Sequence, residues 1–118
     1  MTEALVKLEI NIERRDDGVV VRVGGELDMQ SAPDLSDQLS QLLEAGEHHL
    51  VLDLTDLTFL DSSGLAALLG AHQSAQSRGA SLVLRSPNER IIRLVNIAGL
   101  GDVFEISASR GGEPSDSR

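Results

Sequence analysis

Alternating apolar and polar residues predict two paired strands near the start of the chain. From residue 6 to residue 13 the two kinds of side chain alternate strictly, which is the period of a half-buried strand. The β-branched run at 19–23 predicts a second strand, and the Asp-Gly pair at 17–18 is typical of a hairpin turn between them. The core-facing side of the first strand is expected to carry Val6, Leu8, Ile10 and Ile12.

Helical spacing of apolar residues predicts three helices further along. The first follows Ser31, which has the residue type of an N-cap, and ends near Gly46. The second extends from Ser63 to about Ser77. The third follows the segment Ser86-Pro87-Asn88-Glu89, which has the pattern of a capping box with proline at the first helical position. The residues expected to face the core are Leu35, Leu39, Leu42, Leu43, Leu65, Leu68, Leu69, Ala75, Ile91, Leu94, Val95 and Ala98.

Short apolar runs between these helices predict the remaining strands. They lie at 50–54, 81–85 and 103–106, and the first has the composition of a strand that is covered on both faces. Residues 57–60 are interpreted as a loop. The element order is then β-β-α-β-α-β-α-β, which predicts an α/β fold: a mixed sheet of about five strands with helices packed on it.

The length and composition fit one folded domain. The chain has 118 residues, of which 41% are hydrophobic, so it can bury a core. Phe59 and Phe104 are its only aromatic residues, so the core must be largely aliphatic. Phe59 is expected to lie in the core, and contact with a partner is the alternative. We expect the domain to cover residues 1–106, with a disordered tail at 107–118 that holds no large apolar residue.

The charge and the cysteine count narrow the class of partner. The net charge of −9 argues against nucleic acid or an anionic membrane and favours a protein with a basic or mixed surface. There is no cysteine, and hence no disulfide or thiolate chemistry.

The N-terminus lacks the features of a signal peptide, and no apolar stretch reaches the roughly 20 residues that span a bilayer. We therefore expect a soluble, cytoplasmic protein that is monomeric.

Two adjacent serines, Ser62 and Ser63, lie at the predicted start of the second helix, between Asp61 and Gly64. The simplest interpretation is that Asp61-Ser62-Ser63 caps the helix by accepting backbone N–H groups. A second interpretation is that one hydroxyl accepts a phosphoryl group from another enzyme. The added charge would lie at the favourable end of the helix dipole, so the fold would tolerate it while a docked partner would not.

Two other interpretations of the serines have less support. A serine nucleophile needs a base nearby, but His72 lies about 13 Å further along the predicted helix, and the G-x-S-x-G turn is absent. A nucleotide site would need a glycine-rich loop with lysine, and its phosphates would meet Asp28 and Asp61.

The acidic residues of the central loop are candidates for metal binding. Asp53, Asp56 and Asp61 lie close in sequence, but no histidine accompanies them, so a solvated loop is the favoured interpretation. His48 and His49 would point to opposite faces of a strand, which disfavours joint ligation, and they are expected at the end of that strand away from the serines. The sequence predicts no metal and no cofactor.

The segments Gly25-Glu26-Leu27-Asp28 and LDLTDLTFLDSSGLAALL, taken together, resemble the anti-sigma factor antagonists, which carry the STAS domain. The resemblance covers the chain up to about Ile106. It implies a mixed sheet with helices. It also implies partner switching: the unmodified antagonist binds an anti-sigma factor that is an ATP-dependent serine kinase and so frees the sigma factor, phosphorylation releases the antagonist, and a phosphatase restores it.

The resemblance also implies roles for individual residues. Ser63, the second serine of the pair, corresponds to the phosphate acceptor. The surface expected to contact the partner consists of Gly25, Asp28, Asp61, Ser62, Gly64 and Leu65, with Gly64 allowing the partner backbone to come close. Two rival functions are a subunit that docks on a lipid-transport ATPase and, in the enzyme class, a small serine hydrolase.

Overall fold

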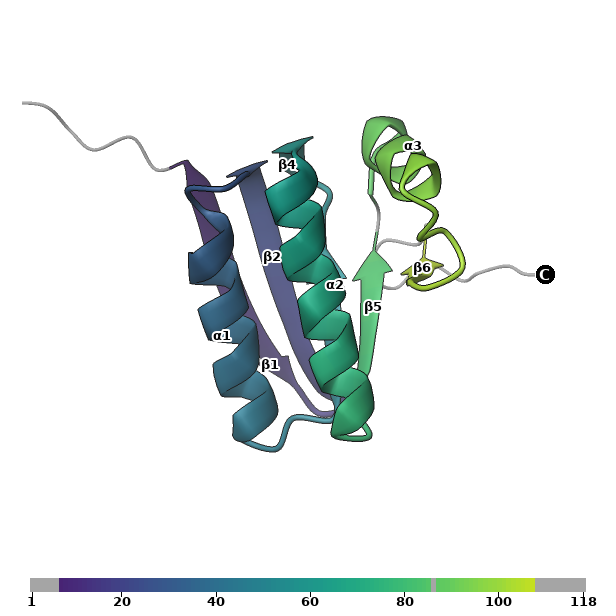
Figure 1. Ribbon diagram of the computed structural model, residues 1–118. Coiled ribbons are helices and arrows are strands. Elements are labelled where there is room, and N and C mark those ends of the chain that lie inside the picture. The colour runs from purple at the N-terminus through teal and green to yellow at the C-terminus, as the bar shows by residue number, and fades with distance from the viewer. Residues whose placement is uncertain (1–6, 86, 108–118) are drawn as a thin grey trace, which may run out of the picture.

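The helices and strands follow one another in the order shown in Figure 1, a computed structural model that describes residues 7–85 and 87–107. Val6, Ser86 and the predicted tail beyond Ser107 lie outside the described residues. The elements are β1 (Leu8–Arg15), β2 (Gly18–Leu27), α1 (Ala32–Glu44), β3 (His49–Asp53), β4 (Leu57–Leu60), α2 (Ser62–Ser77), β5 (Ser81–Arg85), α3 (Glu89–Ile97) and β6 (Glu105–Ser107).

The predicted hairpin is confirmed, and its second strand is longer than expected. β1 and β2 pair antiparallel from Arg15↔Gly18 to Leu8↔Gly25. β2 continues through its glycines because Gly25 adopts a φ of +97°, and a Cβ there would collide with the carbonyl oxygen of Lys7. Only glycine fits this conformation without strain, so the two glycines extend the strand where the sequence predicted a break.

The structure adds a strand, β4, that the sequence did not predict. The first half of β2 pairs in parallel with β3, and its last three residues pair in parallel with β4. A tight turn at Leu54–Leu57 separates β3 from β4. β4 has four residues, of which the first and last are buried, so it lacks the alternation that marks a strand. Phe59 is 44% exposed, and its predicted place in the core is wrong.

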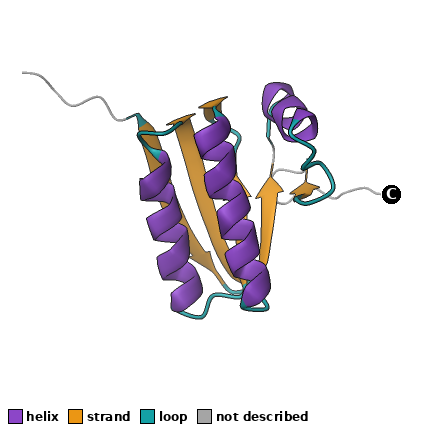
Figure 2. Cartoon of the chain, viewed as in Figure 1, coloured by secondary structure: helices purple, strands orange, loops and turns teal. Residues whose placement is uncertain are grey.

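The strand order places α1 and α2 on the same face of the sheet. The order β1-β2-β3-β5-β6 means that each crossover moves on in the same direction, and right-handed crossovers in one direction put their helices on one side. Figure 2 shows α1 and α2 side by side in front of the strands. The prediction that β3 is covered on both faces is therefore wrong. Leu50 and Leu52 are buried, whereas Val51 and Asp53 are half-buried.

The core between the helices and the sheet is aliphatic apart from Phe104, as the composition predicts. The predicted leucines of α1 are all buried, as are Leu68 and Ala75 of α2 and Ile91 and Val95 of α3. None of the helices in the described ranges is long and apolar enough to cross a bilayer. The last strand, β6, begins two residues later than predicted and reaches Ser107.

The helix caps differ in part from the predictions. The Ser31 side chain does not cap α1; its hydroxyl donates to the carbonyl of Glu26 (2.8 Å) and accepts from the backbone N–H of Asp28 (3.0 Å). α3 is capped by Asn88, whose side-chain oxygen accepts from the N–H of Ile91 (2.9 Å), so Pro87 precedes the helix rather than starting it. α2 is capped by an acidic side chain, described below.

We predict that Gly64→Ala destabilises the fold. A Cβ at Gly64 would lie 2.5 Å from the carbonyl oxygen of Leu27 and 2.7 Å from Leu60 Cδ1, and the backbone of a central strand cannot easily move away. Overpacking of this kind costs about 1–3 kcal/mol of the free energy of unfolding. Urea unfolding measures the loss.

Gly70→Ala is the matched control on the same helix, because nothing lies within 4 Å of the added Cβ. Alanine should stabilise the helix there by roughly 0.5–1 kcal/mol. Equal free energies of unfolding for the two variants would contradict the close contact at Gly64.

Candidate functional site

The predicted site residues gather at one edge of the sheet, where β2 and β4 end side by side. Leu27 pairs with Leu60, so the acids that follow them, Asp28 and Asp61, leave neighbouring strands at the same level. The N–H of Asp61 donates to the carbonyl of Leu27 (3.2 Å). α1 begins a few residues after Asp28 and α2 begins directly after Asp61, so the N-terminal ends of both helices face this edge.

Asp61 caps α2. Its carboxylate accepts from the N–H of Gly64 (2.9 Å), and its carbonyl accepts from the N–H of Leu65 (2.9 Å). Ser62 and Ser63 are the first two residues of the helix, Ser62 exposed and Ser63 half-buried. Neither hydroxyl forms a hydrogen bond with another residue in the part of the chain that the structure describes. The capping role therefore belongs to Asp61, and both serine hydroxyls are available for chemistry.

Asp28 is held by a network of donors. Its Oδ1 accepts from the N–H groups of Gln30 (3.0 Å) and Ser31 (3.1 Å), while its Oδ2 lies 2.7 Å from Lys7 Nζ. The hydrogen bond from Lys7, followed by the bonds from Ser31 and Gln30, lowers the pKa of Asp28 to about 2. Asp28 is thus an anion at neutral pH, fixed close to the start of α2. The sequence did not single out Lys7, which completes this network.

The remaining predicted contact residues lie around this edge in different ways. Gly25 is half-buried, and its carbonyl accepts from the Thr58 hydroxyl (3.0 Å). Leu65 is half-buried and packs against the core. Gly64 is buried, and the space that its missing side chain leaves is filled by Leu27 and Leu60. The explanation that Gly64 admits a partner backbone is therefore wrong, because this glycine allows α2 to approach its own sheet.

The histidines lie away from the serines. His49 begins β3 and its Nδ1 is 2.5 Å from the Ser81 hydroxyl, at the opposite end of the sheet from Ser63, as predicted. The carbonyl of His48 accepts from the N–H of Ser81, so His48 lies at that end too. His72 packs edge-on against Phe104, with ring centroids 5.5 Å apart. None of the three histidines therefore lies beside Ser63 to act as its base.

The acidic residues of the central loop serve separate purposes. Asp53 accepts from the Thr55 hydroxyl (2.6 Å) and pairs with Arg85 (3.1 Å), while Asp61 caps α2. Within residues 7–85 and 87–107, no group of three or more His, Cys, Asp and Glu side chains could hold a metal ion.

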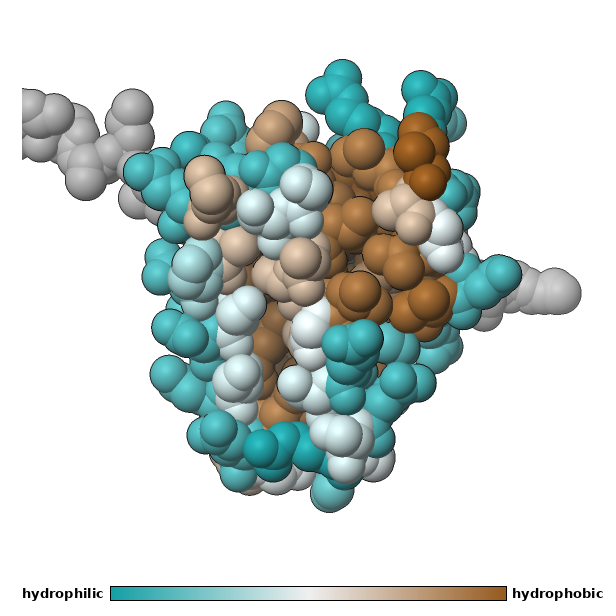
Figure 3. Space-filling model, in the orientation of Figure 1, coloured by the Kyte–Doolittle hydropathy of each residue, from teal (hydrophilic) through white to brown (hydrophobic). Residues whose placement is uncertain are grey.

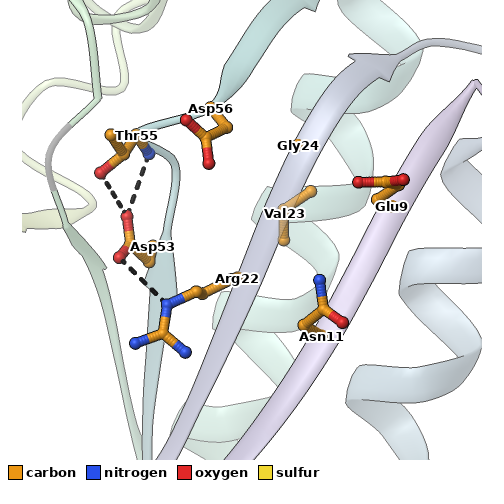
Figure 4. A pocket seen from close by; sticks show the side chains of 8 residues that line it. All are labelled: Glu9, Asn11, Arg22, Val23, Gly24, Asp53, Thr55 and Asp56. Atoms are coloured by element: carbon orange, nitrogen blue, oxygen red, sulfur yellow. Dashed lines mark hydrogen bonds and ion pairs between the residues drawn. The ribbon is translucent and has the colours of Figure 1, made fainter.

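A shallow pocket lies on the sheet face that α1 and α2 leave open (Figure 4). It measures about 190 Å³ and is lined by charged and polar side chains that include Glu9, Arg22, Asp53 and Asp56. Arg22 pairs with Glu13 and Asp53 pairs with Arg85, so the charges of these two lining residues are neutralised within the protein. Small-molecule sites are usually larger, roughly 300–1,000 Å³, and more apolar. We therefore place the candidate site at the serines.

Comparisons with known proteins show the family of this chain. The sequence profile of the STAS domain matches residues 9–112. The chain belongs to the STAS domain family. One relative is the anti-sigma-B factor antagonist of Bacillus subtilis (strain 168), which is 36% identical over 108 residues. The alignment covers 91% of this chain and 98% of that protein.

Solved structures share the STAS fold of this chain. The anti-sigma factor antagonist SpoIIAA in its unphosphorylated form superposes with a TM-score of 0.74 at 23% identity, over 86% of this chain and 90% of that one. The phosphorylated form of the Bacillus cell fate determinant SpoIIAA superposes with a TM-score of 0.69 at 22% identity, over 86% and 93%. The expected mixed α/β architecture is thus confirmed, with β4 as an additional strand.

We predict that the Asp28 ion pair contributes to stability only above acidic pH. Its pKa lies near 2 in the fold, against an ordinary value of 3.8, so folding favours the charged form. The stabilisation is complete above about pH 4 and is lost as the pH falls from there towards 2. Asp28→Asn keeps an Oδ1 acceptor for Gln30 and Ser31 while removing the charge.

The measurement is the free energy of unfolding of the wild-type chain and of Asp28→Asn, from neutral pH down to about pH 2. The wild-type chain should be the more stable at neutral pH, and the difference should shrink below about pH 4. A difference that stays constant down to pH 2 would show that the carboxylate charge at position 28 does not contribute to the free energy of unfolding.

Proposed function

We propose that this STAS domain is an anti-sigma factor antagonist whose binding is switched by phosphorylation of Ser63. In the unmodified state it binds an anti-sigma factor that is also a serine kinase, and thereby frees a sigma factor. The kinase then transfers a phosphoryl group to Ser63 and the antagonist dissociates. A phosphatase restores the hydroxyl. Sigma factors act with RNA polymerase, so the proposal places the protein in the cytoplasm, where we expect it to act as a monomer.

The observation that carries the proposal is the unengaged Ser63 hydroxyl in the first turn of α2. Because Asp61 already accepts the N–H of Gly64, the hydroxyl is not needed to cap the helix. Esterification would therefore break no hydrogen bond among the described residues. The helix N-terminus favours negative charge, so the scaffold should tolerate a phosphate at this position.

The chemistry of the transfer requires nothing catalytic from this chain. The Ser63 oxygen attacks the γ-phosphorus of ATP, the bond from that phosphorus to the β–γ bridging oxygen breaks, and ADP leaves. The hydroxyl proton passes to a base of the kinase or to water. ATP and its metal ion belong to the kinase.

The surface between α2 and α3 suits a protein partner. Figure 3 shows apolar side chains gathered between α2 and α3. Leu65 and Leu69 of α2 are half-buried, while Ile97 of α3 is 75% exposed and Val103 is 36% exposed. Exposed apolar patches commonly mark interaction sites. Ser63 begins the same helix two residues before Leu65, so a partner docked over the N-terminal part of α2 would meet the dianion.

The rival functions have weaker support. A serine hydrolase needs a base within hydrogen-bond reach of its nucleophile, and the histidines lie elsewhere. The relative that aligns over most of this chain is named an anti-sigma-B factor antagonist, and this name does not favour docking on a lipid-transport ATPase.

We predict that the cognate kinase phosphorylates Ser63 and not Ser62. Ser63→Ala should abolish phosphorylation while leaving kinase binding unchanged, and Ser63→Glu should weaken that binding tenfold or more, about 1.4 kcal/mol. Intact mass after incubation with kinase and ATP, with peptide mapping of the site, measures the first effect. Calorimetric titration measures the second.

Ser62→Ala is the matched control, because Ser62 is the neighbouring and more exposed hydroxyl. This variant should still gain one phosphate. Phosphate mapped to Ser62, or full phosphorylation of Ser63→Ala, would refute the assignment of Ser63.

A further inference from the structure

Lys7, the only lysine in the sequence, lies at the same sheet edge as Ser63. It precedes β1, and the hairpin register sets it opposite Glu26, whose N–H donates to the Lys7 carbonyl (2.8 Å). Its ammonium lies 2.7 Å from Asp28 Oδ2 and 3.1 Å from Gln30 Oε1. The backbone at Lys7 is therefore held by the hairpin, while the side chain reaches the turn that follows β2.

The ammonium of Lys7 is surrounded by negative charge. The hydrogen bond to Asp28 raises the pKa of Lys7, and the charges of Asp28, Glu26 and Asp61 raise it further. Since Asp61 is the cap of α2, the cation lies within electrostatic reach of the helix start. A phosphate on Ser63 would add about −1.5 to −2 charges to an edge that already holds these carboxylates.

We propose that Lys7 is the intramolecular counter-ion of phosphorylated Ser63, a role that rests on the proposed function. In the unmodified protein Lys7 pairs with Asp28. After phosphorylation it turns to the phosphate, and the same cation then neutralises a different anion in each state. The partner would meet two changes at once, a new phosphate and an Asp28 carboxylate that has lost its lysine.

The contacts of Asp28 make this exchange feasible. Asp28 Oδ1 keeps its bonds from the N–H groups of Gln30 and Ser31 when Lys7 leaves, so the turn before α1 stays formed. The Lys7 side chain is 37% exposed, and a surface ion pair of this kind is weak and can rearrange. A phosphate offers more charge and three acceptor oxygens, so it competes well with one carboxylate oxygen.

The test installs phosphoserine at position 63 by an expanded genetic code, so that no kinase is needed. A ³¹P NMR titration then gives the dissociation constant of the second phosphate proton in the wild-type background, in Lys7→Gln and in Lys7→Arg. Loss of the cation paired with the phosphate should lower that constant about fivefold in Lys7→Gln. Lys7→Arg, which keeps the charge, should restore the wild-type value.

Arg14→Gln is the matched control, because Arg14 is a cation near the turn end of β1 that pairs with Glu47. It should leave the dissociation constant unchanged. A second readout is the single lysine side-chain ¹⁵N resonance, which should shift when Ser63 carries phosphate. Equal constants in the wild-type chain and Lys7→Gln, or an unmoved resonance, would overturn the proposal.

Binding of the same samples to the kinase separates the two proposals. If the phosphorylated chain fails to bind while Lys7→Gln leaves the titration unchanged, the proposed function stands and the role of Lys7 is refuted. If the titration responds to Lys7 but the phosphorylated chain still binds the kinase, the counter-ion assignment stands and the proposed function is refuted.

Discussion

The parallel pairing of β2 with β4 is the constraint on which the candidate site depends. Leu27 and Leu60 stand opposite each other, so Asp28 and Asp61 leave the sheet at the same level. Gly64 then lets α2 pack directly on the carbonyl of Leu27, with no room for a side chain between them. The first turn of α2, and with it Ser63, is thereby held at a fixed height above the end of β2.

A division of tasks among neighbouring side chains follows from this geometry. Asp61 caps the helix, and Asp28 closes the turn before α1 through the backbone N–H groups of Gln30 and Ser31. Ser63 carries neither task. A chemical change at its hydroxyl therefore alters the charge of the surface without removing an interaction that the scaffold uses. This separation is what a regulatory switch needs, because the partner must detect the change while the domain stays folded.

Local patterns were sufficient to predict most elements of the fold. The three helices and the hairpin depend on spacing and turn residues within the segment itself, and the motif around Ser63 indicated the family. β4 could not be predicted in this way, because four residues without alternation become a strand only when β2 lies beside them. The same holds for Phe59, whose exposure depends on the position of that strand.

The parts of the site that the sequence did not predict depend on contacts between distant segments. The need for glycine at position 64 comes from Leu27, and the environment of Asp28 comes from Lys7 at the far end of the hairpin. Lys7 reaches Asp28 because β2 continues past Gly25, where the sequence suggested that the strand would end.

The most direct test compares the affinity of the native chain for the proposed kinase partner before and after phosphorylation, with both forms titrated in one calorimeter under the same conditions. We expect tight binding by the unmodified form and at least a tenfold loss of affinity for the phosphorylated form. Equal dissociation constants for the two forms would contradict this expectation.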